Sequence, residues 1–310
     1  MQAIVTLHRV AAEDSNAEKR LLVVSMVAAA VLGVVGVVWG ILVGSQMILL
    51  DGIYSFVGIV LSGLLLWASA LSEREPTRRF QFGMEAATPL AIAIQAFVLL
   101  ATLLYAAVEA VYALRSGGSE ITAGWGIAYG VVAAVSCVLA AVELGRRSGH
   151  SDLLLSEAAA WRVAAWRGAG MVVGFVVLLL LQRSRWSEAA PYVDPAMVII
   201  SCVALLPTPL GLLRRTVAEL LEGAPGREIS ELVHAAVREV QAAASLDEPT
   251  VHLSKVGSKL YVEMNTTAGP DTTISQEHEV REALRRRLDA LPYEVWLNVE
   301  LRPREPVTEP

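Results

Sequence analysis

Histidine and cysteine are scarce in this 310-residue sequence. There are two cysteines, Cys137 and Cys202, and each lies inside an apolar run. This spacing excludes a disulfide framework and a CxxC metal motif. The five histidines all fall outside the apolar runs (His8, His150, His234, His252 and His278). The sequence has no Ser/His/Asp set, phosphate-binding loop or cofactor fingerprint, so nothing in it indicates an enzyme.

Charge is also sparse. Only 18% of residues are charged and 55% are hydrophobic, with a mean hydropathy of +0.52. A membrane helix needs about 20 consecutive apolar residues. The apolar runs predict spans near 21–44, 45–71, 88–113, 122–144, 152–181 and 191–213. The net charge of −6 comes mostly from the C-terminal region, which argues against a nucleic-acid partner and leaves the lipid bilayer as the expected one.

The distribution of Lys and Arg between the loops predicts the orientation, because cytoplasmic loops carry more of them. One side holds Arg9, Lys19, Arg20, Arg74, Arg78, Arg79, Arg146, Arg147, Arg214 and Arg215, and the other holds Arg115, Arg183 and Arg185. We therefore expect an inner-membrane protein with both termini in the cytoplasm. A miscounted helix would instead place the C-terminal region outside.

The pattern predicts three parts: a cytosolic lead (1–20), a six-helix membrane domain (21–221) and a cytosolic domain (222–310). In the first span Gly33, Gly36, Gly40 and Gly44 share one face, which favours close helix packing over a pore lining. Two prolines near the end of the sixth span, Pro207 and Pro209, should kink it.

The sequence pattern of the C-terminal region predicts the order helix, strand, strand, helix, strand. The ranges are 229–244, 250–256, 259–264, 275–288 and 294–301, with Gly257-Ser258 as a hairpin turn and Ser275 as a helix N-cap. This order predicts a small α+β ferredoxin-like (αββαβ) domain. Tyr293 and Trp296 are expected in its core or at a dimer contact.

Several motifs accompany this architecture. They are Leu50-Asp51-Gly52-Ile53-Tyr54-Ser55 in the second span, Phe82-Gly83 in the following loop, Tyr192-Val193-Asp194-Pro195-Ala196 at the sixth, and Leu220-Leu221-Glu222-Gly223-Ala224-Pro225 at the domain junction. With six spans and an αββαβ domain, the chain resembles the cation diffusion facilitator (cation efflux) family. The resemblance covers nearly the whole chain and implies a homodimeric antiporter exchanging Zn²⁺ or a similar divalent cation for protons.

The resemblance also implies a transport site made from His or Asp pairs at i, i+4 on the second and fifth helices. The corresponding positions here are Tyr54, Gly58, Ala160 and Ala164, and none of them is a usual zinc ligand. No His or Asp lies anywhere between Leu153 and Leu181, so a shift in alignment does not restore the site. The sequence predicts a member with a degenerate transmembrane metal site.

Charges replace the missing ligands in the fifth span, at Glu157, Arg162 and Arg167. The register implied by the family's site puts Arg167 level with Asp51. The depths agree, because Asp51 lies about 9 Å from the outer end of its span and Arg167 about 22 Å from the cytoplasmic start of its own, in a core about 30 Å thick. We expect Arg167 to pair with Asp51 where a metal would be held, because a planar guanidinium can bind a carboxylate in two places at once. The alternative is that Arg162 and Arg167 snorkel to the membrane surface. Glu157 is expected at a solvated helix end rather than as a proton carrier, and Asp194 as a helix cap.

In the cytosolic domain His252, His278 and Glu300 match positions that the family uses for metal, and they predict a weak metal site. Two further positions hold Tyr261 and Asn298, which are poor zinc ligands. Solvated surface residues are the alternative.

The predicted function is proton-coupled efflux of a divalent metal cation such as Zn²⁺, Mn²⁺, Fe²⁺ or Co²⁺, with no other cofactor. The alternatives are a transport-silent or altered-cargo member acting as a partner or regulatory subunit, and a metal-sensing module. The candidate transport-site region comprises Asp51, Tyr54, Ser55, Gly58, Glu157, Ala160, Arg162, Ala164 and Arg167.

Overall fold

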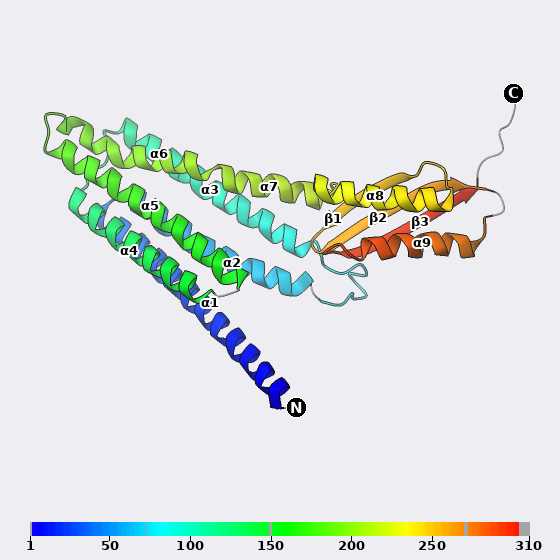
Figure 1. Ribbon diagram of the computed structural model, residues 1–310. Helices are drawn as coiled ribbons and strands as arrows, with labels where there is room; N and C mark the ends of the chain where they lie inside the picture. The colour runs from blue at the N-terminus through cyan, green and yellow to red at the C-terminus, as the bar shows by residue number, and fades with distance from the viewer. Residues whose placement is uncertain (1, 73, 149–150, 270–271, 304–310) are drawn as a thin grey trace, which may run out of the picture. The chain divides into compact units, whose positions relative to one another are not determined.

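The computed structural model describes residues 2–72, 74–148, 151–269 and 272–303. In that part of the chain six helical segments are long and apolar enough to cross a membrane, as predicted. They belong to α1 (Gln2–Val43), α2 (Gln46–Ser72), α3 (Ala87–Arg115), α4 (Ala123–Arg147), α5 (Asp152–Gln182), and the series η1 (Ser187–Tyr192), α6 (Val193–Leu205) and α7 (Pro207–Leu220) (Figure 1). The predicted lead is the helical beginning of α1, whose membrane segment starts at Arg20.

The glycines of α1 allow its backbone to approach that of α2. A Cβ built on Gly36 would lie 2.8 Å from the Gly52 Cα, and one on Gly40 would lie 2.6 Å from the Leu49 backbone nitrogen. A Cβ built on Gly33 would lie 3.2 Å from the Phe56 backbone nitrogen. Gly44 differs, because its φ of +71° makes the turn between the helices. Three of the four glycines therefore serve the predicted close packing.

The sixth span is interrupted where the prolines predict it. One helix ends at Leu205 and the next begins at Pro207. Proline suits the first turn of a helix because it lacks an N–H to donate there. The second helix also continues beyond the predicted end of the span, to Leu220.

The chain forms two compact units. One contains residues 1–63 and 97–209, and the other contains residues 64–96 and 210–310. In the first, α4 and α5 form an antiparallel hairpin through small residues. A Cβ on Gly168 would lie 3.1 Å from Ala134, and one on Gly130 would lie 2.9 Å from the Val172 side chain.

The second unit contains the αββαβ domain: α8 (Arg227–Ala244), β1 (Thr250–Val256), β2 (Lys259–Ala268), α9 (Ile274–Leu288) and β3 (Glu294–Pro303). The sheet order is β1-β2-β3, with β1 and β2 antiparallel and β2 and β3 parallel. Apolar residues of α8 and α9 pack on one sheet face, where Val262, Leu297 and Val299 are buried. The predicted fold class is confirmed.

The cap of α9 differs from the prediction. Thr273, not Ser275, is the N-cap, and its hydroxyl accepts a hydrogen bond from the Gln276 backbone nitrogen. The Gln276 side chain in turn accepts from the Thr273 backbone nitrogen at 2.8 Å, completing a capping box. The Thr-x-x-Gln spacing of Thr273 and Gln276 is typical of a capping box and could have identified this cap from the sequence.

Two carboxylates in the same unit hold the turn between β1 and β2. Glu85 accepts a hydrogen bond from the Ser258 hydroxyl at 2.8 Å and lies 3.6 Å from Lys259 Nζ, with both charged side chains about nine-tenths buried. Glu219 accepts from Lys255 Nζ and from the Gly257 backbone nitrogen, each at 2.8 Å. The sheet is thereby joined to the chain segments that lead into α3 and out of α7.

Candidate functional site

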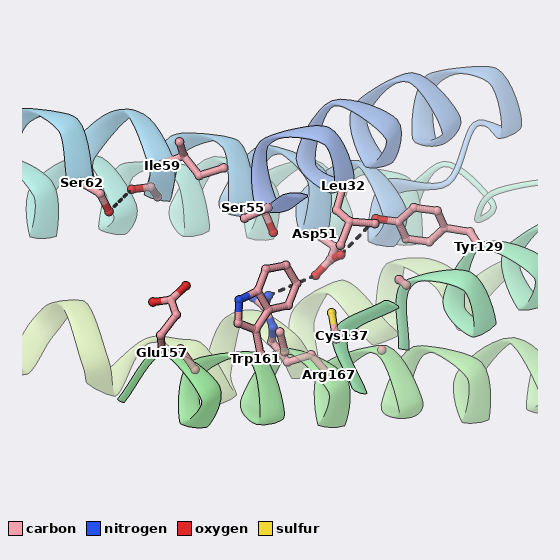
Figure 2. A pocket seen from close by; sticks show the side chains of 16 residues that line it. Leu32, Asp51, Ser55, Ile59, Ser62, Tyr129, Cys137, Glu157, Trp161 and Arg167 are labelled. Atoms are coloured by element: carbon pink, nitrogen blue, oxygen red, sulfur yellow. Dashed lines mark hydrogen bonds and ion pairs between the residues drawn. The ribbon is translucent and has the colours of Figure 1, made fainter. Parts of the chain in front are cut away.

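A cavity of about 220 Å³ lies among α1, α2, α4 and α5. Helical periodicity explains which residues face it, because positions three or four apart share one side of a helix. From α2 these include Asp51, Ser55, Gly58 and Ser62, and from α5 they include Glu157, Ala160, Ala164 and Arg167. Figure 2 shows Glu157 at one end of this cavity and Asp51 with Arg167 at the other.

The two charges of the predicted pair lie together. Arg167 Nη2 is 3.7 Å from Asp51 Oδ1, and the side chains are 29% and 18% exposed. The other carboxylate oxygen accepts a hydrogen bond from the Tyr129 hydroxyl at 3.1 Å (Figure 2). The distance is that of an ion pair rather than a two-point hydrogen bond, so the fork geometry expected from sequence is not formed.

Arg167 is only partly satisfied by these contacts. Its guanidinium carbon lies 5.7 Å from the centre of the Tyr54 ring, within cation–π range. Its Nε is buried and has no hydrogen-bond partner among the described residues. A buried donor without a partner is unfavourable. The guanidinium is therefore held by Asp51 and Tyr54, but its hydrogen-bonding capacity is not fully used.

A second cavity of about 350 Å³ lies among α2, α5 and α6. Tyr54 lines this cavity and not the first one, together with Met171 and Met197. Asp51 and Arg167 line both cavities. The ion pair therefore stands where the two spaces meet.

The four positions implied by the family resemblance carry no metal donors. Gly58, Ala160 and Ala164 line the first cavity and Tyr54 the second. Among the residues that the structure describes, no group of three or more His, Cys, Asp and Glu side chains is placed to hold a metal ion. A complete tetrahedral zinc site is thus missing from the described part of the chain.

Glu157 is partly buried in the cavity instead of lying at a solvated helix end. Its carboxylate accepts a hydrogen bond from the Ser25 hydroxyl at 2.7 Å, and Ser25 accepts one from Trp161 Nε1 at 2.6 Å. The sequence analysis did not identify Ser25, although it is the sole hydroxyl residue in the apolar part of α1. It also missed Tyr129, which is buried among apolar residues of α4 and carries a polar end.

Arg162 lies apart from this site. Its side chain is exposed and lines a separate cavity between α4 and α5. Its Nε donates to the Ala158 carbonyl oxygen at 3.4 Å. The two arginines of α5 therefore face different surroundings.

Asp194 is a helix cap, but for a different helix from the one expected. Its buried carboxylate accepts hydrogen bonds from the Ser45 hydroxyl at 2.7 Å, the Gln46 backbone nitrogen at 2.9 Å and the Met47 backbone nitrogen at 3.3 Å. These groups begin α2, whereas α6 has Tyr192 at its N-cap and no side-chain cap. Sequence order could not show that α6 caps α2.

Among the described residues, the three side chains predicted to form a weak cytosolic metal site do not come together. His252 and Glu300 alternate with residues that face the helices, so they lie on the open face of the sheet. His278 is exposed on α9, which packs against the opposite face. Glu300 instead accepts two hydrogen bonds of 3.0 Å from Arg302, which lower the pKa of its carboxyl group.

Trp296 does not lie in the core, the first of the two places expected for it, and a position at a dimer contact stays a prediction. It is 54% exposed on that same face, and its ring centre lies 5.8 Å from that of Phe82. Tyr293 does pack against the core as a partly buried residue.

Residues 22–221 match the cation efflux transmembrane domain. The chain belongs to the cation efflux family. This confirms the family predicted from the motifs, an integral membrane family of transporters rather than enzymes. The zinc transporter ZitB of Escherichia coli strain K12 is 29% identical over 248 residues, which is 80% of this chain and 76% of ZitB.

Two further relatives of this cation efflux protein are manganese efflux system proteins of Bacillus subtilis strain 168. MneS is 20% identical over 285 residues, covering 91% of this chain and 94% of its own length. MneP is 20% identical over 280 residues, covering 90% of this chain and 93% of its own. The similarity extends beyond the membrane helices into the C-terminal domain.

Proposed function

We propose that this protein exports a divalent metal cation through the two cavities bounded by Asp51 and Arg167. The observation that carries the proposal is that this ion pair lines both spaces. Relatives named for zinc and manganese support divalent metals as the cargo class. The protein works with both termini in the cytoplasm, as the excess of Lys and Arg predicts.

In this proposal Asp51 binds the metal cation, and Arg167 competes with that cation for the Asp51 carboxylate. A divalent ion entering the first cavity is attracted by Asp51 and Glu157 and repelled by Arg167. Binding therefore requires the guanidinium to move away from Asp51. The 3.7 Å separation and the unpartnered Nε make this displacement less costly than breaking a two-point hydrogen-bonded pair.

The exchange ion is a proton in this account. A carboxylate that releases a metal ion can take up a proton, and the first cavity contains two, Asp51 and Glu157. Glu157 accepts its hydrogen bond from Ser25, so protonating Glu157 changes its link to α1. The transporter is a homodimer in this proposal, as the family resemblance implies.

Purified protein in proteoliposomes tests the proposal. A pH gradient should drive flux of Zn²⁺ or Mn²⁺, with Fe²⁺ and Co²⁺ as further cargoes to compare. Asp51→Asn should abolish flux, because it removes the charge while keeping the size. Arg147→Gln is the control, since Arg147 pairs with Glu143 and lines neither cavity, and it should leave flux unchanged.

A transport-silent partner or regulatory subunit is the second candidate. It is favoured by the absence of a group of three metal donors among the described residues and by the fixed cation beside Asp51. Folded wild-type protein that moves none of the four ions under a pH gradient would support this second function and reject the first.

A further inference from the structure

The α4–α5 hairpin carries a cavity of about 690 Å³ that shares no lining residue with the two cavities at Asp51. Its floor is apolar and built from small side chains, including Ala134 and Ala141 of α4 and Ala165 and Ala169 of α5. Both helices are long and apolar enough to span a membrane, and Val138 and Val142 of the groove are about half exposed. Small side chains leave open space beside the helix backbones of the hairpin.

Two arginines, Arg146 and Arg162, line the same groove. The packing of Gly168 on Ala134 sets the antiparallel register, which puts Arg146 level with about residue 156 of α5. The Arg162 backbone is about 9 Å deeper at 1.5 Å per residue. Its Nε donates to the Ala158 carbonyl, so the side chain runs back one turn toward Arg146. The two positive charges thus approach a common depth near the C-terminal end of α4.

No carboxylate of the described residues lies within ion-pair distance of Arg146 or Arg162. The adjacent Arg147, by contrast, pairs with Glu143 at 2.5 Å and does not line the groove. Arg162 belongs to a membrane span, where an unpaired charge is costly. Trp166 borders the groove and is 78% exposed, so the groove is open to its surroundings on this side.

We propose that this groove binds one acidic phospholipid. Arg146 and Arg162 hold its phosphate, and one acyl chain lies along the alanines between α4 and α5. Charge complementarity favours a lipid over a second copy of the hairpin, which would bring like charges to the groove. The site is independent of metal transport at Asp51, and it accounts for Arg162.

Native mass spectrometry of the purified full-length protein tests this, with phosphatidylglycerol titrated in detergent and phosphatidylcholine as the uncharged comparison. Wild-type protein should bind one phosphatidylglycerol per chain in preference to phosphatidylcholine. Removing one arginine should weaken that binding about fivefold, and Arg146→Gln with Arg162→Gln about 25-fold. Arg147→Gln is the matched control and should change the affinity less than about twofold, since Arg147 is paired outside the groove.

Val142→Trp gives a test that leaves every charge in place. Val142 is 47% exposed and lines the groove, so a larger side chain should block the acyl chain and weaken phosphatidylglycerol binding at least about fivefold. Equal binding of the two lipids would overturn the proposal, as would wild-type affinity in both the double variant and Val142→Trp. A dimer that Val142→Trp dissociates without affecting lipid binding would assign the groove to a second copy instead.

Discussion

The coupling between Asp51 and Arg167 is the prediction most open to measurement. Arg167→Gln removes the guanidinium charge, and Asp51→Asn removes the carboxylate charge at nearly constant volume. At 3.7 Å and an effective dielectric constant of about 20, two unit charges attract by about 4.5 kcal/mol. The side chains are 29% and 18% exposed, so water reduces this attraction. We expect a coupling free energy of about 2 kcal/mol.

A double-mutant cycle measures that coupling. The free energy of unfolding would be obtained for wild type, each single variant and the double variant, from denaturant titrations in detergent followed by tryptophan fluorescence. Each single variant should be destabilised, because it leaves the other charge unpaired in a membrane cavity. The double variant should recover about 2 kcal/mol relative to the sum of the single effects.

The same cycle with Arg162→Gln in place of Arg167→Gln serves as its control, because Arg162 lines neither cavity at Asp51. That cycle should show a coupling below about 0.5 kcal/mol. A coupling below about 0.5 kcal/mol between Asp51 and Arg167 themselves would refute the pairing.

Three further predictions concern stability. Asp194→Ala should lower the free energy of unfolding by about 2 kcal/mol in denaturant titrations, because α2 loses its cap, whereas an unchanged value would exclude that role. Gly36→Ala should lower the melting temperature because its methyl group meets the α2 backbone, at a cost of about 1–3 kcal/mol. Gly58→Ala enters open space and should be tolerated, so equal effects of the two would contradict the packing. Lys259→Met should leave the buried Glu85 carboxylate without a counter-charge and speed hydrogen exchange at the β1–β2 turn. Glu294 is a 69% exposed partner of Lys259, so Glu294→Gln should leave hydrogen exchange unchanged. Faster exchange in Glu294→Gln than in Lys259→Met would contradict this role of Lys259.

The membrane helices could be predicted because their signal is local. A run of apolar residues long enough to span a bilayer has few alternatives, and the break between Leu205 and Pro207 follows from proline chemistry. The strands could be predicted equally well from the sequence, since β3 alternates buried Leu297 and Val299 with residues of the open face.

The contacts between distant helices were harder to predict. Asp51 and Arg167 could be matched because both are charged and the family resemblance supplied a register. Asp194 gave no such indication, because the backbone groups that it caps lie in α2, about 150 residues earlier in the chain. The Ser25 contact to Glu157 likewise depends on how α1 lies against α5, which periodicity within either helix does not determine.

Metal binding to the Arg167→Gln variant tests the central claim most directly. Mn²⁺ binding to full-length protein in nanodiscs would be measured by calorimetry, with Asp51→Asn and the double variant alongside. If Arg167 competes with the cation for Asp51, Arg167→Gln should bind Mn²⁺ at least about tenfold more tightly than wild type. Adding Asp51→Asn should abolish that gain. Equal Mn²⁺ affinity in wild type and Arg167→Gln, or a gain that persists without Asp51, would contradict the account.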